Sequence, residues 1–575
     1  MLLSLAFLLA SVAATTCGRK CKNIPGDSNW PSQDEWASLN ETIGGNLIAT
    51  VPLASVCHSQ GAFALLNESA CDILKGQWDY SEVHFEAPAS IMPGWFQESC
   101  NPFSPASEPC ELGDYASYSI SVNSVDDVVA GIRFSRDHNV RLVIKNTGHD
   151  ATGKSTGRGA LSLWMKNLKS RDIIQNYQSS YYTGPAIKLG AGVLGLEAYE
   201  TADAESYRIA GGNCPSVGIV GGYTQGGGHS QMGSVYGMAA DNILEWEVVT
   251  ADGTHLTATP SNNNSDLYWA LSGGGGGTYG VVVSMTTRLH ADGPIGGGYL
   301  TFDNQTVGTD TFWHAVGLFN SKLPGMLDAG NTTIAYSLAS NTFGIYNIAS
   351  DGRDAEEVRA ILQPFLDDLE SLGVPYNCTT HQSATFLEHL RRDYGPFPNG
   401  PFTTSGILGG RLIPRSVLLE TSGNDDITQI LRDTASGADY AILMQSLDVE
   451  SPPVAQVSDN AVLPAWRQTA VQLILSAAWD WSVPRAEMAR REGVVADELI
   501  PRLVQATPGS GAYLNEANMR QVDWQDAFFG PNYGRLLDIK NKYDPESLFY
   551  ATQAVGSEAW AEDAQGRLCR PARAR

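Results

Sequence analysis

The hydrophobic pattern changes from irregular to periodic near Tyr115. Residues 16–112 are rich in Pro, Trp, Asn and Cys and show little periodicity, which predicts an irregular, Cys-rich N-terminal cap with short helices. From Tyr115 to Asp150 the pattern predicts a strand, then a helix opened by Ser124 and Asp126, then a short buried strand with the sequence RLVIK. The change therefore marks the start of a region that mixes helices and strands.

Glycine-rich apolar runs dominate residues 186–290. The runs AIKLGAG, GIVGGYTQGGG, ILEWEVVTADG and YGVVVSMTTRL predict strands separated by glycine turns. The Ala251-Asp252-Gly253 turn predicts a hairpin between two of these strands. From Gly296 to Arg520, strands and helices are mixed, and AEEVRAILQPFLDDLESLG has the apolar spacing of a helix. This part predicts a second α+β domain packed on the first.

The N-terminal stretch MLLSLAFLLASVAATT is apolar, too short to cross a bilayer, and followed by small residues. It predicts a secretory signal over residues 1–15, with a buried N-terminal helix as the alternative. No later stretch approaches the roughly 20 continuous apolar residues that a membrane span needs. We therefore expect a secreted protein that does not bind membranes, with vesicular or vacuolar residence left open.

Cysteines and glycosylation acceptors agree with export. Most of the nine cysteines lie near the N-terminus, which suits a disulfide-stapled cap, although spacing does not reveal the pairing. The C-x3-C at Cys17 and Cys21 lacks a second pair of ligands, so no metal site is predicted. Six N-x-S/T acceptors predict surface glycosylation, at Asn40, Asn67, Asn263, Asn304, Asn331 and Asn377.

The charge balance argues against one class of partner. The chain carries 37 basic and 62 acidic side chains, for a net charge of -25. Such a surface repels a phosphate backbone, so nucleic-acid binding is not expected. The acidic residues are spread without long blocks, which indicates a solvated surface and no further function. Nothing in the sequence indicates the oligomeric state.

One glycine motif is misleading. Gly190, Gly192 and Gly195 form a G-x-G-x-x-G after a strand-like run, the pattern of a dinucleotide-binding Rossmann turn. A Rossmann unit also needs a further strand ending in an acidic residue about 20 positions on, whereas this chain continues into the polar segment ESYRIAGGNCP. We therefore reject a Rossmann fold. The denser glycines after Gly211 suit backbone amides that approach a ligand closely, with tight turns of a β protein as the alternative.

Several long motifs occur in one order along the chain, and together they resemble a known family. They begin at Asn146 (NTGHDATGKSTG), Gly211 (GGNCPSVGIVGGYTQGGGHS), Tyr236 (YGMAADNILEWEVVTADG), Leu267 (LYWALSGGGGGTYGVV) and Phe528 (FFGPNYGRLLDIKNKYDPESLFY). This set is similar to the vanillyl alcohol oxidase and p-cresol methylhydroxylase (PCMH) superfamily, in its berberine bridge enzyme-like branch. The cap also resembles that of secreted fungal members, some called isoamyl alcohol oxidases.

The resemblance implies an α+β fold with a two-subdomain PCMH-type FAD-binding domain and an α+β substrate domain with an antiparallel sheet. The implied ranges are 1–15 for the signal, 16–112 for the cap, 113–295 for the FAD domain, 296–520 for the substrate domain and 521–575 for a berberine-bridge-like C-terminal segment that returns to the FAD domain.

The resemblance also implies a bicovalent FAD. His149 matches the histidine that bonds the flavin 8α-methyl, and Cys214 matches the cysteine that bonds C6. Alone, each would be a buried core residue. The other implied cofactor-binding residues are Asn146, Thr147, Gly148, Asp150, Ser155, Gly211, Gly212, Val217, Gly218, Gly221, Gly222, Gly226, Gly227, Gly228, Gly237, Asn242, Asn532 and Tyr533.

The catalytic residues are expected in the segment GAYLNEAN. Related plant proteins have a Tyr-x-Asn-Tyr element there, and this chain has Tyr513 with Glu516 in place of the second Tyr. Oxidation of an alcohol or amine needs a base for the O–H or N–H proton. We expect Tyr513 to be this base or a substrate positioner, and Glu516 to be its partner or the base itself. Tyr279 and His229 are weaker candidates.

The expected function is an FAD-linked oxidase or dehydrogenase that acts on an alcohol, amine, sugar or secondary metabolite, with O2 as the expected electron acceptor. Two alternatives remain open from the sequence. One is a flavoprotein that steers the cyclisation of a secondary metabolite, and the other is a carbohydrate-binding glycoprotein without redox chemistry. The substrate is not identified, because its pocket comes from residues 296–520, where no motif dictates a ligand.

Overall fold

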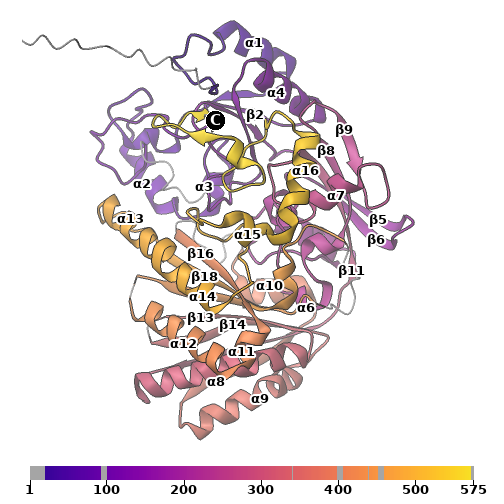
Figure 1. Cartoon of the computed structure of the whole chain (residues 1–575), viewed down its shortest axis with the longest axis vertical. Helices are drawn as coiled ribbons and strands as arrows, with labels where there is room; N and C mark the ends of the chain where they lie inside the picture. Colours follow the sequence, from indigo (N-terminus) through magenta and orange to yellow (C-terminus); the bar gives the residue numbers. More distant parts are fainter. Residues whose placement is uncertain are drawn as a thin grey trace, which may run out of the picture.

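A computed structural model describes residues 20–91, 100–339, 341–397, 406–437, 439–450 and 459–571. The segment expected to be a signal, residues 1–15, and Cys17 lie outside these ranges. The chain forms two layered α+β parts, one above the other in Figure 1, with a C-terminal segment that returns to the first part.

A four-stranded sheet, in the order β1-β2-β4-β3, opens the first part. Strands β2 (Tyr118–Ser121), β4 (Ala160–Trp164) and β3 (Arg141–Lys145) run parallel, and helix α4 (Val125–Asp137) connects β2 to β3. Strand β1 (Leu47–Ala49) joins antiparallel to β2. The expected irregular cap thus contributes a strand to this sheet, since its backbone amides find partners on the exposed edge of β2.

The helices of this region follow from local sequence signals. Ser124 caps α4 in a reciprocal capping box with Asp127, as the Ser-x-x-Asp pattern favours. The cap contains the expected short helices, and its disulfides join Cys57 to Cys71 and Cys100 to Cys110. These helices are α1 (Gln33–Thr42), η1 (Leu53–Cys57), α2 (Glu68–Gln77) and α3 (Ser81–Phe85).

A five-stranded antiparallel sheet follows, in the order β5-β6-β10-β8-β9. Its strands are β5 (Arg171–Gln178), β6 (Thr183–Gly190), β10 (Val281–Arg288), β8 (Ile243–Val249) and β9 (His255–Ala258). The expected hairpin is present as the antiparallel pair of β8 and β9. Strand β10 is almost wholly buried, as its unbroken apolar run predicts.

Two glycine-rich segments follow strand β6. Residues 219–223 were expected to form a strand, and this was wrong, because Ile219–Tyr223 (η3) is a short helical turn with a kink at Gly221. Thr224 and Gln225 donate side-chain hydrogen bonds back to its first carbonyls, which a strand would leave to a neighbour. The rejected Rossmann motif lies between β6 and α5 (Gly195–Asp203), where every partner of β6 is antiparallel.

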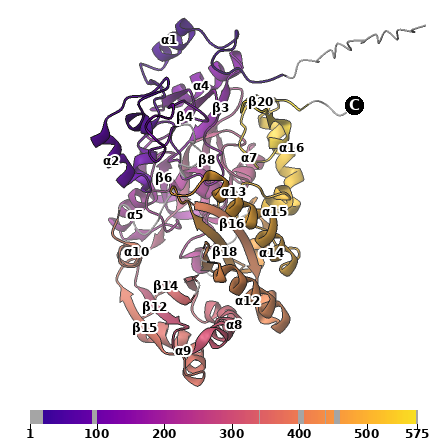
Figure 2. The ribbon, with the colours of Figure 1, turned by 90° about the vertical axis from the view of Figure 1, so that its left-hand side faces the viewer.

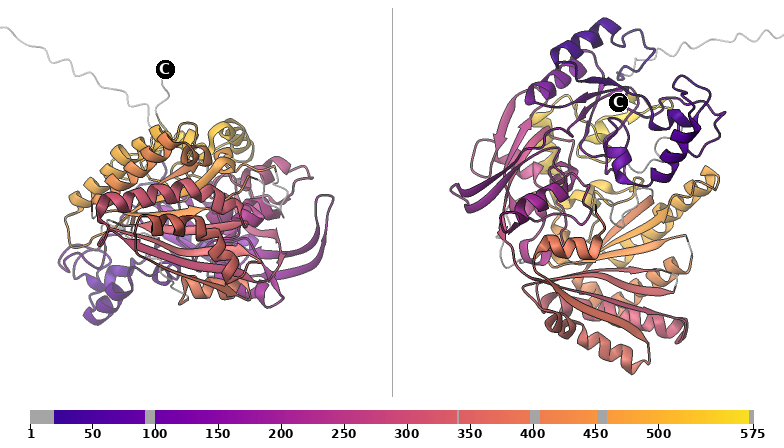
Figure 3. Two further views of the ribbon diagram at one scale, coloured as in Figure 1. Left: turned by 90° about the horizontal axis from the view of Figure 1, so that it is seen from below. Right: turned by 180° about the vertical axis from the view of Figure 1, so that it is seen from behind.

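The second part is built on a seven-stranded antiparallel sheet, as expected for the substrate domain, in the order β15-β12-β14-β13-β17-β18-β16. It fans out in the lower half of the right-hand view of Figure 3. The strands are β12 (Ile295–Asp303), β13 (Thr332–Leu338), β14 (Thr342–Asp351), β15 (Tyr376–Ser383), β16 (Gly406–Pro414), β17 (Ala441–Ser446) and β18 (Thr469–Ala478).

Long helices cover one face of this sheet and form its apolar core (Figure 1). The expected helix is present as α9, where Asp354 caps the N-terminus and Val358, Leu362 and Phe365 point into the core. The helices of this part include α8 (Gly308–Asp328), α9 (Ala355–Ser371), α10 (Phe386–Tyr394), α11 (Arg415–Leu419), α12 (Thr421–Ser436), α13 (Arg485–Val494) and α14 (Ile500–Ala506).

The C-terminal segment crosses back to the first part. Helix α15 (Trp524–Phe529) precedes α16 (Tyr533–Tyr543), which packs on α7 (Ser265–Leu271) on one side of the molecule (Figure 2). The short pair β19 (Ala561–Glu562) and β20 (Leu568–Cys569) follows. A disulfide joins Cys569 to Cys21, so the two ends of the folded chain are covalently linked.

Other described elements are shorter. They are β7 (Tyr207–Arg208), β11 (His290–Ala291), α6 (Gly233–Tyr236), η4 (Ala239–Asn242), η5 (Pro464–Gln468), η6 (Val495–Leu499), η7 (Gly530–Asn532) and η8 (Ser557–Ala559). Within the described ranges, no helix has the length and apolar character that a bilayer crossing requires.

Candidate active site

A cavity of about 450 Å3 lies where the first part, the seven-stranded sheet and the C-terminal segment meet. Side chains alternate across the strands of that sheet, so Leu443 and Gln445 line the cavity while Ile442 lies in the helix-covered core. Fourteen of the predicted site residues line the cavity, namely Asn146, Thr147, Gly148, His149, Asp150, Ser155, Gly212, Cys214, Val217, Gly218, Gly221, Gly222, Tyr513 and Glu516.

The other eight predicted residues are not among those that line the cavity. Asn242 is buried and holds a turn through hydrogen bonds to Tyr236 O and Met238 O. Asn532 donates to two carbonyls of the neighbouring 461–462 segment. These eight residues are Gly211, Gly226, Gly227, Gly228, Gly237, Asn242, Asn532 and Tyr533. Their contact with a cofactor stays a prediction.

His149 and Cys214 converge on the same side of the cavity from separate loops. His149 follows strand β3, and Cys214 lies in the loop before η3, yet Cys214 Sγ lies 3.9 Å from His149 Nε2. Ser216 Oγ lies 2.8 Å from His149 Nε2 and 3.5 Å from Cys214 Sγ, and it donates to Ser81 Oγ at 2.8 Å. Because the Ser216 proton is committed to Ser81, Ser216 accepts the Nε2–H of His149, which leaves His149 Nδ1 as the nitrogen with a free lone pair.

Burial sets the protonation of both groups. It lowers the pKa of His149 to about 3, with a smaller contribution from the nearby His84, so the imidazole is neutral at ordinary pH. Burial raises the pKa of the Cys214 thiol, while hydrogen bonds from Ser216 and Val217 oppose the rise. The pair therefore presents a neutral imidazole, which has a nucleophilic lone pair, beside a protonated thiol, which becomes a nucleophile only once it loses its proton.

The loop from Asn146 to Ser155 is held by its own side chains. Asp150 Oδ2 accepts from Ser155 N at 2.6 Å and from Ser155 Oγ at 2.7 Å, and Asp150 Oδ1 accepts from Thr152 N at 3.2 Å. Lys154 points inward, and its Nζ donates to Leu514 O at 3.2 Å. Burial lowers the pKa of Lys154 to about 8, so a lysine that is still largely charged at neutral pH lines the cavity.

Glycines keep the cavity floor open. A Cβ on Gly218 would lie 1.8 Å from Asn146 Oδ1, and one on Gly221 would lie 2.9 Å from the Asn146 amide, so these glycines allow Asn146 to sit against the turn. A Cβ on Gly222 meets no protein atom within 4 Å, so this glycine opens onto free space. Bare backbone of this kind allows a flat ring system or a pyrophosphate to approach closely.

Glu516 lines the cavity beside strand β18 of the seven-stranded sheet, and its partner His229 is 287 residues away in the sequence. Glu516 Oε2 lies 3.2 Å from His229 Nε2 and accepts from Gln472 Nε2 at 2.7 Å. These two donors orient the carboxylate and satisfy it with hydrogen bonds. Sequence reasoning named Glu516 and gave His229 less weight. It missed Gln472, because only the sheet brings β18 beside residues 513–516.

Tyr513 is buried beside the same group. Its ring makes edge contacts with His229 and Trp466, and its hydroxyl accepts from Asn515 Nδ2 at 2.8 Å. Burial raises the pKa of Tyr513, and the Glu516 charge raises it further. The hydroxyl is therefore protonated at neutral pH. Tyr279, the other weaker candidate, donates to Gly274 O and lies outside the cavity wall.

Three more polar residues line the cavity. Tyr346 on β14 has its pKa raised to about 12 by burial and by the Glu516 charge. Gln445 accepts from Asn213 at 3.3 Å, and within the described ranges its Nε2 has no hydrogen-bond partner. The Oε1 of Gln472, its cross-strand neighbour, has none there either. Sequence patterning offered no signal for these residues, because a polar residue on a strand is ordinarily a solvent-facing one.

The donor set fits FAD. The cavity combines a glycine floor, a neutral histidine beside a thiol, a buried lysine, and the side-chain oxygen of Asn146, which has no partner among the described residues. Unpaired polar atoms facing a cavity are what a polar ring such as isoalloxazine satisfies. His149, Cys214, Asn146 and the backbone around Gly218 and Gly222 would hold the flavin, and Glu516 and Tyr513 face the space left for a substrate.

Comparison with known proteins agrees with this assignment. The FAD binding domain family matches residues 116–259, and the berberine and berberine like family matches residues 512–556. A VAO-type flavoprotein oxidase from Thermothelomyces thermophilus is 49% identical over 558 residues, covering 96% of this chain and 95% of that protein. A bifunctional decalin synthase from Penicillium decumbens is 47% identical, covering 99% of each chain. The crystal structure of VAO-type flavoprotein MtVAO615 from Myceliophthora thermophila C1 matches with a TM-score of 0.93 at 48% identity, covering 96% of this chain and all of that one.

Proposed function

The chain belongs to the berberine bridge enzyme-like family of VAO-type, FAD-linked oxidoreductases, and from this premise we propose that it oxidises an alcohol, amine or related secondary-metabolite carbon. Bound FAD supplies the two-electron acceptor for that carbon. The observation that carries the proposal is the convergence of His149 and Cys214 on one side of the cavity and of Glu516 on its substrate side. Family membership leaves the non-redox glycoprotein alternative without support.

A bicovalent FAD, tethered through His149 and Cys214, is the first part of the proposal. The hydrogen bond of His149 Nε2 to Ser216 leaves Nδ1 free to bond the ring. A glucooligosaccharide oxidase from Acremonium strictum, which shares the fold at 20% identity and a TM-score of 0.61, carries a 6-S-cysteinyl, 8α-N1-histidyl FAD. Two tethers hold a flavin without protein over both of its faces, which leaves room for a bulky substrate.

The test of the tethers is acid precipitation of the purified protein followed by visible spectra of pellet and supernatant. Wild type, His149→Ala and Cys214→Ala are expected to keep the yellow colour in the pellet, and the double variant is expected to release it. Cys378→Ala, which removes a cysteine that lies outside any disulfide and away from the cavity, is the matched control and is expected to keep a covalent flavin. A colourless wild-type pellet would refute the covalent attachment.

The second part of the proposal assigns the base to Glu516. Its carboxylate receives the O–H or N–H proton of the substrate, while Gln472 and His229 hold it in place. Tyr513 keeps its proton at neutral pH because burial raises its pKa, so its role is to position the substrate. The Gln445 and Gln472 amides offer a free donor and a free acceptor to a polar group of the substrate.

A second candidate function is the steering of a cyclisation without net oxidation, because the Penicillium decumbens relative is a bifunctional decalin synthase. Substrate screening by anaerobic flavin bleaching separates the two. An oxidase bleaches with substrate and regains colour with O2, at one product per O2 consumed. A cyclase converts its substrate into an isomer without bleaching and without O2 uptake, so equal masses of substrate and product would favour this second function.

The proposal also includes secretion, glycosylation and O2 as electron acceptor. Three disulfides suit an oxidising compartment. Four of the six glycosylation acceptors lie on exposed residues, Asn67, Asn263, Asn331 and Asn377. Expression in a secreting host is expected to place the protein in the medium, beginning at or after residue 16, with a mass that falls on enzymatic deglycosylation. An intracellular, unglycosylated product would contradict this part.

A further inference from the structure

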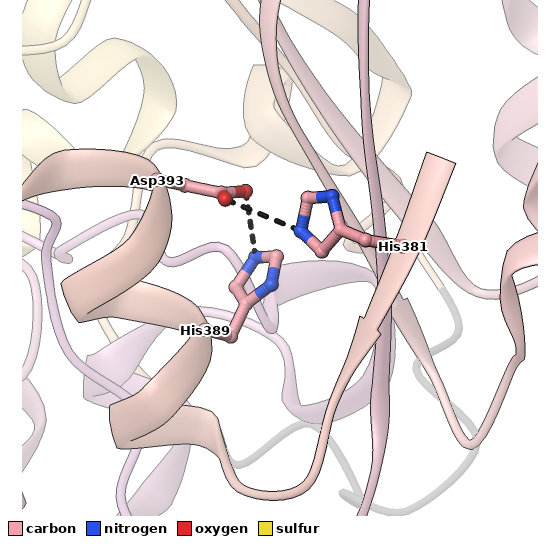
Figure 4. A group of neighbouring side chains, drawn as sticks. All are labelled: His381, His389 and Asp393. Atoms are coloured by element: carbon pink, nitrogen blue, oxygen red, sulfur yellow. Dashed lines mark ion pairs between the residues drawn. The ribbon is translucent and has the colours of Figure 1, made fainter. Parts of the chain in front are cut away.

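A cluster of metal-ligating side chains lies outside the active site, at the edge of the seven-stranded sheet. His381 comes from edge strand β15, and His389 and Asp393 come from one face of α10, four residues apart. Figure 4 shows the two imidazoles and the carboxylate turned toward one common point between the strand and the helix. None of these residues takes part in the proposed oxidation.

The spacing of the cluster suits a tetrahedral ion. Asp393 Oδ1 lies 3.3 Å from His381 Nε2, and Asp393 Oδ2 lies 3.5 Å from His389 Nε2. Adjacent ligand atoms of a tetrahedral zinc site stand about 3.4 Å apart when each bond is about 2.1 Å. The three ligand atoms lie within 4.8 Å of one another. Small side-chain shifts would therefore bring all three to bonding distance of one ion.

The carboxylate of Asp393 lacks a compensating cation. Its side chain is 0% exposed, and among the described residues no lysine or arginine forms an ion pair with it. A buried charge of this kind is ordinarily paired or bound to a metal. A divalent cation bound at this point would balance the charge of the carboxylate.

The surroundings of the cluster resemble the second shell of a metal site. Tyr299 donates to Asp393 Oδ1 at 2.6 Å, as a group that orients a ligating carboxylate does. Asn347 Nδ2 lies 2.6 Å from Asp393 Oδ2 and 2.9 Å from His389 Nε2. The Asn347 Oδ1 has no hydrogen-bond partner within the described residues. Turned by 180°, this amide presents its oxygen to the cluster as a fourth donor.

A glycine on the neighbouring strand gives the cluster its space. Gly297 on β12 is the cross-strand partner of His381, and a Cβ there would lie 2.3 Å from His381 Nε2. Within the described residues, His381 Nε2 lies 3.3 Å from Asp393 Oδ1 without forming a hydrogen bond to it. The cluster thus combines an imidazole nitrogen that makes no hydrogen bond among the described residues with a buried carboxylate that has no lysine or arginine partner there.

We propose that His381, His389 and Asp393 bind one Zn2+ ion in a structural site, with the Asn347 amide oxygen as the fourth ligand. Imidazole nitrogen and carboxylate oxygen are a usual ligand set for zinc. The ion clamps α10 to the sheet edge. Tyr394, the next residue on α10, accepts from Asn213 at 3.1 Å beside Cys214, so the clamp also supports the wall of the flavin cavity.

The test uses the purified flavoprotein, dialysed against a chelator and then titrated with ZnCl2 in a calorimeter, with zinc counted by elemental analysis. Wild type is expected to bind one Zn2+ per chain and to melt at a higher temperature with zinc than without. His389→Gln is expected to lose the stoichiometric binding. Tyr299→Phe keeps the ring and all three ligands, and it is expected to weaken zinc binding about 10-fold by removing the bond to Asp393.

The matched control is His255→Gln, which removes an exposed histidine far along the chain from the cluster. It is expected to bind one Zn2+ with wild-type affinity. Zinc K-edge absorption of the wild type is expected to show only nitrogen and oxygen ligands. The proposal is overturned if the chelator-treated wild type binds no Zn2+, since the cluster is then a hydrogen-bonded network. It is equally overturned if His389→Gln and Tyr299→Phe both bind as tightly as the wild type.

Discussion

At the scale of single residues, Glu516 and Tyr513 differ in what they can do at neutral pH. Glu516 accepts hydrogen bonds from two neighbours, whereas Tyr513 keeps its proton because burial raises its pKa. We expect Glu516→Gln to slow flavin reduction by about 10²- to 10⁴-fold at saturating substrate, the usual contribution of a general base. Tyr513→Phe is expected to slow it by less than about 10-fold. Stopped-flow bleaching of the flavin measures both rates.

Glutamine retains the shape of Glu516 and can still hydrogen-bond to His229, so a large loss in that variant reports the missing base. Normal flavin content and an unchanged melting temperature control for misfolding. The reverse order of effects, with Tyr513→Phe the more damaging, would transfer the role of base to Tyr513.

Gln445 carries a prediction about substrate binding. Its Nε2 faces the cavity without a partner among the described residues, and an unpaired buried donor favours a substrate that satisfies it. We expect Gln445→Leu to raise KM about 10-fold with kcat nearly unchanged, since the contact is present in both ground and transition states. Leu443→Met, an apolar change on the same cavity wall, is the control and should leave KM near the wild-type value. An unchanged KM in Gln445→Leu would mean that the Gln445 amide does not contribute to substrate binding.

At the scale of elements, local sequence signals predicted the helices best. Apolar spacing predicted α4 and α9, and Ser124 predicted the start of α4, because those signals act within a few residues. The glycine run at 219–223 was read as a strand and is a helical turn. Apolar residues between glycines fit either state, and the choice depends on the side chains of Thr224 and Gln225 that close the turn.

Sequence patterns did not predict contacts between segments that are far apart in the chain. Strand β1 joins β2 across about 70 residues of chain, and Glu516 meets His229 across 287. The motif resemblance located His149 and Cys214, but Ser216, which bridges them, was missed although it lies two residues after Cys214. The cluster at Asp393 shows only its helical half in the sequence, because His381 reaches it from a neighbouring strand.

The turn that begins at Gly218 packs closely against Asn146. A Cβ at this position would lie 1.8 Å from Asn146 Oδ1, so Gly218→Ala must displace Asn146 from the cavity wall. We expect this variant to fold with reduced flavin content, measured as the ratio of flavin to protein absorbance. Gly534→Ala in α16, whose Cβ would meet nothing within 4 Å, is the control and should keep full flavin. Full flavin content in Gly218→Ala would show that the turn can accommodate the added methyl group without weakening flavin binding.

At the scale of the whole molecule, buried histidines make stability depend on pH. Burial lowers the pKa of His84 to about 4 and that of His290 to about 3, from about 6.5 in an unfolded chain. Between these values the unfolded chain binds protons that the folded chain does not, so the free energy of unfolding falls as pH falls below 6.5. Each such histidine contributes up to about 1.4 kcal/mol per pH unit.

We therefore expect the melting temperature to fall between pH 7 and pH 5, measured by scanning calorimetry. His84→Gln removes one of these groups, so its melting temperature should be lower at pH 7 and should fall less steeply toward pH 5. His255→Gln, at an exposed position, should follow the wild-type slope. Equal slopes in wild type and His84→Gln would mean that His84 does not stay neutral in the folded protein.

A disulfide links the two ends of the folded chain. Cys21 and Cys569 are 548 residues apart, and their disulfide closes the loop that contains both domains. Closing a long loop removes entropy from the unfolded chain and typically stabilises a protein by about 2 to 4 kcal/mol. The same ends also meet through a hydrogen bond from Lys22 N to Leu568 O at 2.8 Å and an ion pair of Arg567 with Asp27 at 2.9 Å.

We expect the double variant Cys21→Ser with Cys569→Ser to melt at a lower temperature and to expose its C-terminal segment to limited proteolysis. Cys378→Ser, which changes a cysteine outside any disulfide, is the control and should match the wild type. The comparison also separates two ways of closing the molecule. If the double variant melts with the control, the noncovalent contacts hold the C-terminal segment on the flavin domain by themselves. If it is cut near residue 560 while the rest stays folded, the disulfide is what keeps that segment in place.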